Sequence, residues 1–154
     1  MTSSVEARPQ DLILDANVLS RLARIGRIDL LSATLPNRCA ISPTIYREIE
    51  AGINSGVLYL QAVIASVQRG EIRVLGLEDK DQEFITSVPR KLARGEAEGI
   101  ALCKRLDMVF VTHDRKAANY CQHMGITCLH FHTLVDALYQ RELLTATEAQ
   151  QALD

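Results

Sequence analysis

The sequence predicts an α/β fold, a three-layer sandwich in which helices cover a central, mostly parallel five-stranded sheet. Short apolar runs of the kind that form buried strands alternate along the chain with longer segments of helical periodicity. Such alternation is typical of a parallel sheet, because each strand returns to the same edge through a crossover helix. The expected strands are Leu12–Leu14, Cys39–Ile41, Ile72–Leu75, Met108–Thr112 and Thr127–Leu129.

Capping residues and helix breakers define the helices between these strands. Asn17 is predicted to cap a helix that stops at Gly26, and a further turn or two begins at Ile28. Ser42 and Pro43 open the next helix, since proline is favoured at the first helical position. The remaining helices are expected over residues 56–69, from Asp79 to about Arg90, over Glu96–Leu106 and Arg115–Met124, and as two short helices around a Thr145 cap between about Leu134 and Leu153.

Length and composition fit one domain. The chain has 154 residues, of which 47% are hydrophobic and 23% charged, and these are ordinary values for a globular protein. They exclude a disordered chain, a collagen and a small disulfide-stapled protein. Residues 1–10 are expected to form a flexible leader, and residues 11–154 a single domain.

Charge and cysteine spacing limit the function and the compartment. The chain carries 17 Lys and Arg against 19 Asp and Glu, a net charge of -2, so binding of nucleic acid through bulk positive charge is not expected. Local arginines or metal ions would have to attract such a partner.

The four cysteines lack metal-type spacing and are expected in the core. No stretch approaches the roughly 18 apolar residues that span a bilayer, and no secretory signal is visible. A cytoplasmic protein without membrane contact is expected.

Acidic residues follow two of the expected strands and recur on two of the helices. Asp15 closes the first strand and Asp114 stands just beyond the fourth. In an open parallel sheet, functional groups gather at the carboxyl ends of the strands, so the two aspartates meet at one rim if these strands are neighbours. Four glutamates lie in segments that can reach the same rim: Glu96 and Glu98 in the first turn of one helix, and Glu48 and Glu50 on the helix after the second strand.

Clustered carboxylates repel one another unless a cation or a proton is shared among them. Mg²⁺ and Mn²⁺ prefer oxygen ligands and can activate water for hydrolysis of a phosphodiester. On spacing alone, an alternative stays open. Asp15 and Asp114 can be helix caps and the glutamates solvated residues of the first helical turn.

Four segments stand out within residues 11–130: Leu12–Leu19, Ile41–Ile49, Gly95–Leu102 and Val111–Asp114. Together they resemble the four sequence blocks of a PIN domain, in the family's order. The Gly-Glu-Ala-Glu block and residues 22–31 are similar to a prokaryotic subgroup close to the VapC-type toxin ribonucleases of toxin–antitoxin systems. The resemblance implies a PIN-like fold.

The resemblance also implies roles for individual residues. Asp15, Glu48, Glu98 and Asp114 correspond to the catalytic acids, and Asp15, Glu98 and Asp114 to the metal ligands. Helical periodicity does not choose between Glu48 and Glu50, or between Glu96 and Glu98, and only the motif register does. The implied supporting residues are Asn17, Thr112 and Glu96.

The function that the resemblance implies is a Mg²⁺- or Mn²⁺-dependent endoribonuclease, the toxin of a type II toxin–antitoxin pair. Such proteins are often homodimers and are often inhibited by an antitoxin peptide. An alternative function is a catalytically inactive PIN-like module for binding or scaffolding. An Asp15→Asn variant separates the two.

Several basic residues are candidates for contact with RNA. Arg115 and Lys116 adjoin Asp114, and Arg21 belongs to a stripe with Arg24 and Arg27, which is otherwise the solvated face of a helix. Arg90, Lys91 and Arg94, just before the Glu96 helix, are candidates for flanking the acidic rim. His113 can touch a phosphate, whereas His130 and His132 are expected to be ordinary surface or core residues rather than zinc ligands. The sequence shows no aromatic platform for base stacking.

Overall fold

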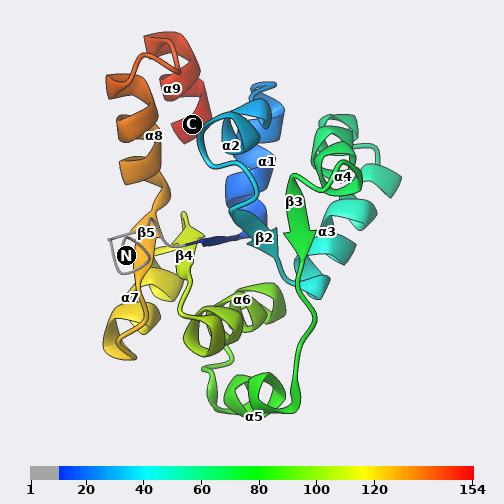
Figure 1. Cartoon of the computed structure of the whole chain (residues 1–154), viewed down its shortest axis with the longest axis vertical. Helices are drawn as coiled ribbons and strands as arrows, with labels where there is room; N and C mark the ends of the chain where they lie inside the picture. Colours follow the sequence, from blue (N-terminus) through cyan, green and yellow to red (C-terminus); the bar gives the residue numbers. More distant parts are fainter. Residues whose placement is uncertain (1–10) are drawn as a thin grey trace, which may run out of the picture.

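The computed structural model describes residues 11–154, and the leader predicted over residues 1–10 lies outside the described residues. The central sheet has five strands in the order β3-β2-β1-β4-β5. Every neighbouring pair is parallel, so the predicted α/β architecture is confirmed (Figure 1). The strands are β1 (Leu12–Leu14), β2 (Cys39–Ile41), β3 (Ile72–Val74), β4 (Val109–Thr112) and β5 (Cys128–His130).

Helices connect each strand to the next. They are α1 (Ala16–Arg24), α2 (Asp29–Thr34), α3 (Pro43–Asn54), α4 (Gln61–Gln68), α5 (Asp79–Ser87), α6 (Arg94–Leu106), α7 (Arg115–His123), α8 (Phe131–Gln140) and α9 (Ala146–Leu153), with a 3-10 turn, η2 (Leu58–Leu60), before α4. Within the described part of the chain, no helix is both long and apolar enough to cross a membrane.

Local capping chemistry confirms two of the predicted helix starts and corrects a third. Ser42 Oγ accepts a hydrogen bond from the Ile45 amide at the start of α3, and Thr145 and Glu148 form a reciprocal capping box on α9. The predicted Asn17 cap is wrong. Asp15 caps α1, because its backbone is extended and its carboxylate accepts from the Ala16 amide.

The helix predicted over residues 56–69 begins later than expected. Gly56 has a φ of 103°, in the region that favours glycine, and it lies in the turn between α3 and η2. The helical segment then runs as η2 and continues directly as α4. The later start therefore has a conformational cause that the apolar composition of the segment conceals.

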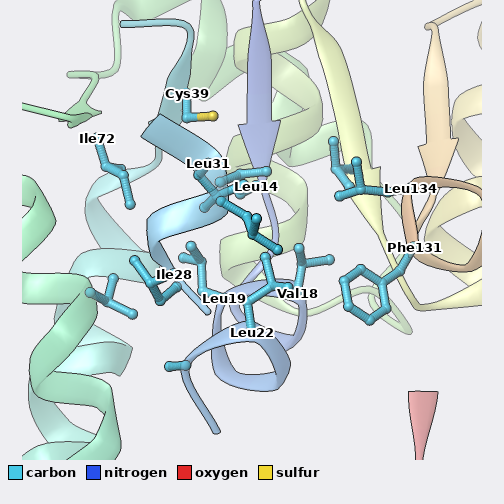
Figure 2. Close-up of a cluster of buried hydrophobic side chains, with 14 of the residues drawn as sticks. Leu14, Val18, Leu19, Leu22, Ile28, Leu31, Cys39, Ile72, Phe131 and Leu134 are labelled. Atoms are coloured by element: carbon cyan, nitrogen blue, oxygen red, sulfur yellow. The ribbon is translucent and has the colours of Figure 1, made fainter. Parts of the chain in front are cut away.

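Two hydrophobic layers hold the sheet between its helices. Side chains alternate across β1, so that Leu12 and Leu14 join one layer and Ile13 the other. The first layer packs against α1, α2, α8 and neighbouring elements, and Figure 2 shows it around Leu14, Leu19 and Phe131. The second layer packs against α5, α6 and α7.

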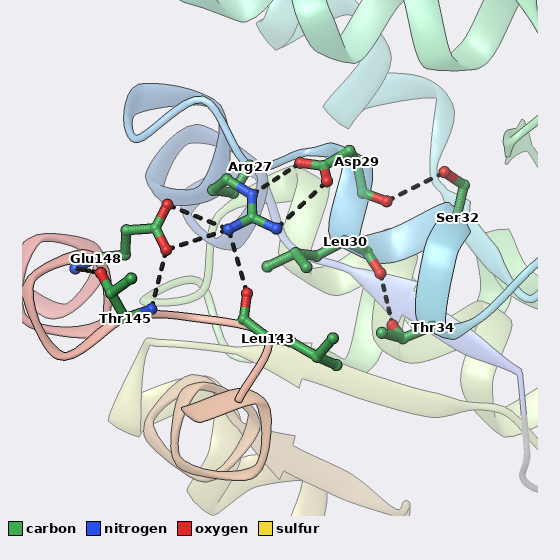
Figure 3. A network of polar contacts seen from close by, with 8 residues as sticks. All are labelled: Arg27, Asp29, Leu30, Ser32, Thr34, Leu143, Thr145 and Glu148. Carbon is green, nitrogen blue, oxygen red and sulfur yellow. Dashed lines mark hydrogen bonds and ion pairs between the residues drawn. The ribbon is translucent and has the colours of Figure 1, made fainter. Parts of the chain in front are cut away.

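The arginine stripe at the end of α1 attaches α9 to the domain. Arg21 Nη1 donates to the Ala152 carbonyl at 2.9 Å, and Arg24 Nη2 donates to the Gln151 carbonyl at 2.6 Å. Arg27 donates to both Glu148 oxygens at 3.1 Å and to the Leu143 carbonyl (Figure 3). The three guanidinium groups are thus engaged within the fold, as cations near a helix C-terminus often are.

A Gly99→Ala variant tests the close contact of α6 with the sheet. An added Cβ would lie 2.6 Å from Phe110 Cε1 and 3.2 Å from Ile13 Cγ2, and both side chains are buried. We expect the free energy of unfolding to fall by about 1–2 kcal/mol, because overpacking outweighs the higher helix propensity of alanine. Urea denaturation measures it. The control is Gly76→Ala, where nothing lies within 4 Å of the added Cβ and the stability should barely change.

Candidate active site

The pairing of β1 with β4 brings the two strand-end aspartates together. Leu14 is in register with Val111, and the Asp15 amide donates to the Val111 carbonyl at 3.0 Å. Asp114 follows β4 and caps α7 by accepting from the Lys116 amide at 2.8 Å. Because β1 is the central strand of the order β3-β2-β1-β4-β5, this is the edge where the connections diverge, the usual place for a site in such sheets.

An open pocket of about 650 Å³ lies at this edge. Four carboxylates line it, and two lysines provide positive charge. The lining residues are Asp15, Ala16, Asn17, Ser20, Ile45, Glu48, Lys91, Ala93, Glu96, His113, Asp114 and Lys116. The acids come from four separate segments of the chain, so only the folded structure assembles them.

Thr112 connects the two aspartates. Its hydroxyl donates to Asp15 Oδ2 at 2.8 Å and accepts from the Asp114 amide at 3.0 Å. Asp15 is 5% exposed, and burial raises the pKa of its carboxyl although these hydrogen bonds act in the opposite direction. The predicted supporting residue Thr112 therefore lies between the acids and fixes their orientation.

Glu96 lies against both aspartates. Its Oε1 accepts from the Ala93 amide at 2.9 Å, and its carboxyl forms hydrogen bonds with Asp15 and Asp114. Burial, followed by the Asp114 hydrogen bond and the charges of both aspartates, raises the pKa of Glu96 to about 8. At neutral pH these three acids share a proton, as close carboxylates do when no cation balances them.

Glu48 reaches the pocket from α3. Burial and the charges of Asp15 and Glu98 raise the pKa of its carboxyl. The approach depends on Gly95, because an added Cβ there would lie 3.0 Å from Glu48 Oε2. Glu50, the alternative that periodicity left open, is exposed and does not line the pocket.

Glu98 has different partners from the acids that line the pocket. It is 1% exposed, its Oε2 accepts from Thr44 Oγ1 at 2.6 Å and from Arg94 Nε at 2.8 Å, and its Oε1 accepts from the Thr44 amide at 3.0 Å. Burial alone would raise the pKa of Glu98, but these contacts outweigh it and lower the pKa. The geometry thus places Glu96, and not Glu98, with Asp15 and Asp114. Residues two positions apart on a helix point to nearly opposite sides.

The described chain matches one known family along its whole length. A family model described as a PIN domain (DUF3368) matches residues 11–154. The chain belongs to the PIN-domain family. PIN domains are generally metal-dependent nucleases. No curated protein gives a significant match.

The fold of this PIN domain recurs in a solved archaeal structure. That structure is a domain of a functionally unknown protein from Methanocaldococcus jannaschii DSM 2661, with 17% sequence identity and a TM-score of 0.51. The match covers 79% of this chain and 90% of that chain. At this identity the likeness shows the fold alone.

The basic residues of the PIN domain divide between the pocket and the scaffold. Lys91 and Lys116 line the pocket, whereas Arg115 is exposed beside it and Arg94 pairs with Glu98. Arg21 does not line the pocket. Its Nε donates to Asn17 Oδ1 at 2.6 Å, and through this contact it orients a residue that does.

Two polar residues at this edge have no counterpart in the sequence-based prediction. Ser20 lines the pocket one turn after Ala16, and Thr44 holds Glu98. The i, i+3 spacing from the predicted residue Asn17 to Ser20 was the signal that could have identified Ser20. No local signal links Thr44 to Glu98, because the two lie on different helices, α3 and α6.

The donor chemistry of the pocket suits a hard divalent cation. The available donors are carboxylate and hydroxyl oxygens, which Mg²⁺ and Mn²⁺ prefer. Over residues 11–154, no three His, Cys, Asp or Glu side chains are already arranged to hold a metal ion. Glu96 instead contacts the two aspartates through shared hydrogen bonds, and that arrangement carries an electrostatic cost.

A Glu96→Gln variant tests this cost in metal-free protein. The pKa of Glu96 is about 8 in the folded state and near the ordinary glutamate value of 4.5 when unfolded, so the folded state holds the extra proton between these values. Stability of the parent therefore falls as the pH rises through that range. The variant should be more stable than the parent by on the order of 2 kcal/mol at pH 8.5 and by little at pH 4.5.

Thermal and urea unfolding in a chelator, at several pH values, measure this difference. The matched control is Glu50→Gln, an exposed change outside the pocket, which should leave the pH dependence of the parent unaltered. Identical pH dependence in the parent and in Glu96→Gln would contradict the shared-proton arrangement.

Proposed function

We propose that this PIN domain is a Mg²⁺- or Mn²⁺-dependent endoribonuclease and that Asp15, Glu48, Glu96 and Asp114 hold the cation. The convergence of these carboxylates at the carboxyl edge of β1 and β4 carries the proposal. Glu96 takes the place that motif register gave to Glu98, because Glu98 already has Arg94 and Thr44 as partners.

The raised pKa values of Asp15, Glu48 and Glu96 support a cation at this position. A doubly charged ion stabilises the ionised carboxylates that otherwise share a proton. When bound, it supplies activation of water and compensation of the charge that builds on the phosphate.

The residues around the acids have roles in binding and orientation. Thr112 fixes Asp15 and Asp114 through its hydroxyl, and Arg21 fixes Asn17. Lys91 and Lys116 come from different segments of the pocket wall and attract the phosphates of the substrate. Their positive charge is local, in agreement with a chain whose net charge is -2.

The biological role that we propose is that of a cytoplasmic toxin in a type II toxin–antitoxin pair. Its support is the similarity of residues 22–31 and of the Gly-Glu-Ala-Glu block to VapC-type toxins. We propose further that the protein is a homodimer and that an antitoxin peptide with basic side chains covers the acidic pocket. A catalytically inactive binding module is the second candidate.

An Asp15→Asn variant decides between these candidates. We expect Mn²⁺-dependent cleavage of RNA by the parent to fall by at least roughly 100-fold in the variant, the upper end of the loss that a supporting residue alone causes. The fold should persist, because asparagine can still accept from the Ala16 amide. Gel analysis of total RNA, with and without a chelator, measures cleavage, and circular dichroism checks the fold. Absence of cleavage by the parent with either ion would favour the binding module.

A paired comparison of Glu96→Gln and Glu98→Gln tests which glutamate is the ligand. The Glu96 variant should bind Mn²⁺ at least roughly tenfold more weakly without loss of stability. The Glu98 variant should retain Mn²⁺ affinity within about threefold. Its free energy of unfolding should fall by about 1–2 kcal/mol, because the charged contacts with Arg94 and Thr44 weaken. Calorimetric titration and urea unfolding measure the two quantities, and the opposite pattern would restore Glu98 as the ligand.

A further inference from the structure

Three histidine rings gather beside the acidic pocket, and one of them, His113, lines it. His113 follows β4, His130 ends β5, and His132 lies in the first turn of α8. Their ring centroids are 5.4 Å apart for His113–His130 and His113–His132, and 5.5 Å apart for His130–His132. Parallel pairing of β4 with β5, in which Thr112 is in register with His130, brings these distant segments together.

The rings form a fixed aromatic group. The His113 and His132 planes differ by only 24° and are stacked, while the buried Phe131 meets His113 edge-on at 5.5 Å. His130 Nδ1 accepts from the His132 amide at 3.2 Å, which holds the His130 ring. His113 faces the pocket, and His132 is exposed to solvent. The cluster therefore extends from the acids to the surface.

The geometry of the rings favours a nucleobase over a metal ion as their ligand. His130 Nδ1 already accepts from the His132 amide, so that nitrogen is not available to a metal. The imidazole rings offer flat aromatic faces, on which nucleobases stack.

Positive charge lies near the rings. Arg21 acts on His113 and Arg115 acts on His130, and Lys116 lines the adjoining pocket. Aromatic faces flanked by cations are the usual combination for single-stranded nucleic acid, where the rings hold a base and the cations hold the backbone. Base-paired nucleotides cannot present a free face in this way.

We propose that His113, His130 and His132 form a stacking platform for an unpaired RNA base beside the acidic pocket. This inference rests on the proposed nuclease function and adds to it a binding site for a base next to the cleaved phosphate. The proposal differs from the expectation of no stacking platform, because His113 lies far in the sequence from the other two histidines and only the fold brings them together.

Two variants of His132, the exposed member of the platform, test the proposal. His132→Ala should weaken binding of a fluorescein-labelled single-stranded RNA of about twelve nucleotides and random sequence roughly five- to tenfold. His132→Phe retains a flat ring without metal-binding nitrogens, and it should restore affinity to within about twofold of the parent. Fluorescence anisotropy in Ca²⁺ measures binding, and cleavage in Mn²⁺ is measured in parallel. The control is His123→Ala, another exposed histidine, on α7.

Each outcome decides the question. Equal affinity of the parent and His132→Ala, with cleavage intact, overturns the platform and leaves the nuclease function standing. Loss of affinity in both the Ala and Phe variants, together with loss of Zn²⁺ binding by calorimetry, overturns it in favour of a metal site. A parent that neither binds nor cleaves RNA overturns the nuclease function as well. Equal affinity for the same RNA in a duplex would also contradict the platform.

Discussion

Parallel pairing of β1 with β4 concentrates negative charge at one edge of the sheet, and the rest of the site depends on it. The Asp15 amide bonds to the Val111 carbonyl, and Thr112 then holds both Asp15 and Asp114 through one hydroxyl. The register of the two strands thus places both aspartates at the same edge of the sheet. Glu96 and Glu48 enter from α6 and α3, and burial with mutual repulsion raises the pKa of each.

Glu96 and Glu98 show that carboxylates on the same helix can have opposite roles. Glu98 is the more buried of the two, yet contacts from Thr44 and Arg94 lower its pKa and make it a stable link between α6 and α3. Among residues 11–154, no ion pair of Glu96 with a basic side chain is formed, and Glu96 is held against two other acids. A carboxylate held against other acids is more informative about function than one paired with a cation and hydrogen-bond donors. The repulsion destabilises the fold, so the stability of the fold gives no reason for such a carboxylate.

The basic groups also divide into those that have partners within the fold and those that remain at the site. Arg24 and Arg27 are engaged by α9 and its preceding turn, so they contribute to the scaffold rather than to the pocket. Lys91 and Lys116 line the pocket wall, where their positive charge can meet a phosphate. The histidine rings occupy the flank beyond β4 and β5. The site therefore combines an acidic centre, local cations and an aromatic side.

The sequence by itself determined the five strands, the caps at Ser42 and Thr145, and the acids that follow β1 and β4, because periodicity, capping and strand-end position are local properties. It could not choose between Glu96 and Glu98, since both fit the first turn of a helix. Only the packing of α6 against α3 and β1 decided which carboxylate meets Asp15. The role of Arg21 and the histidine cluster were equally beyond local patterns, because each depends on contacts between segments far apart in the chain.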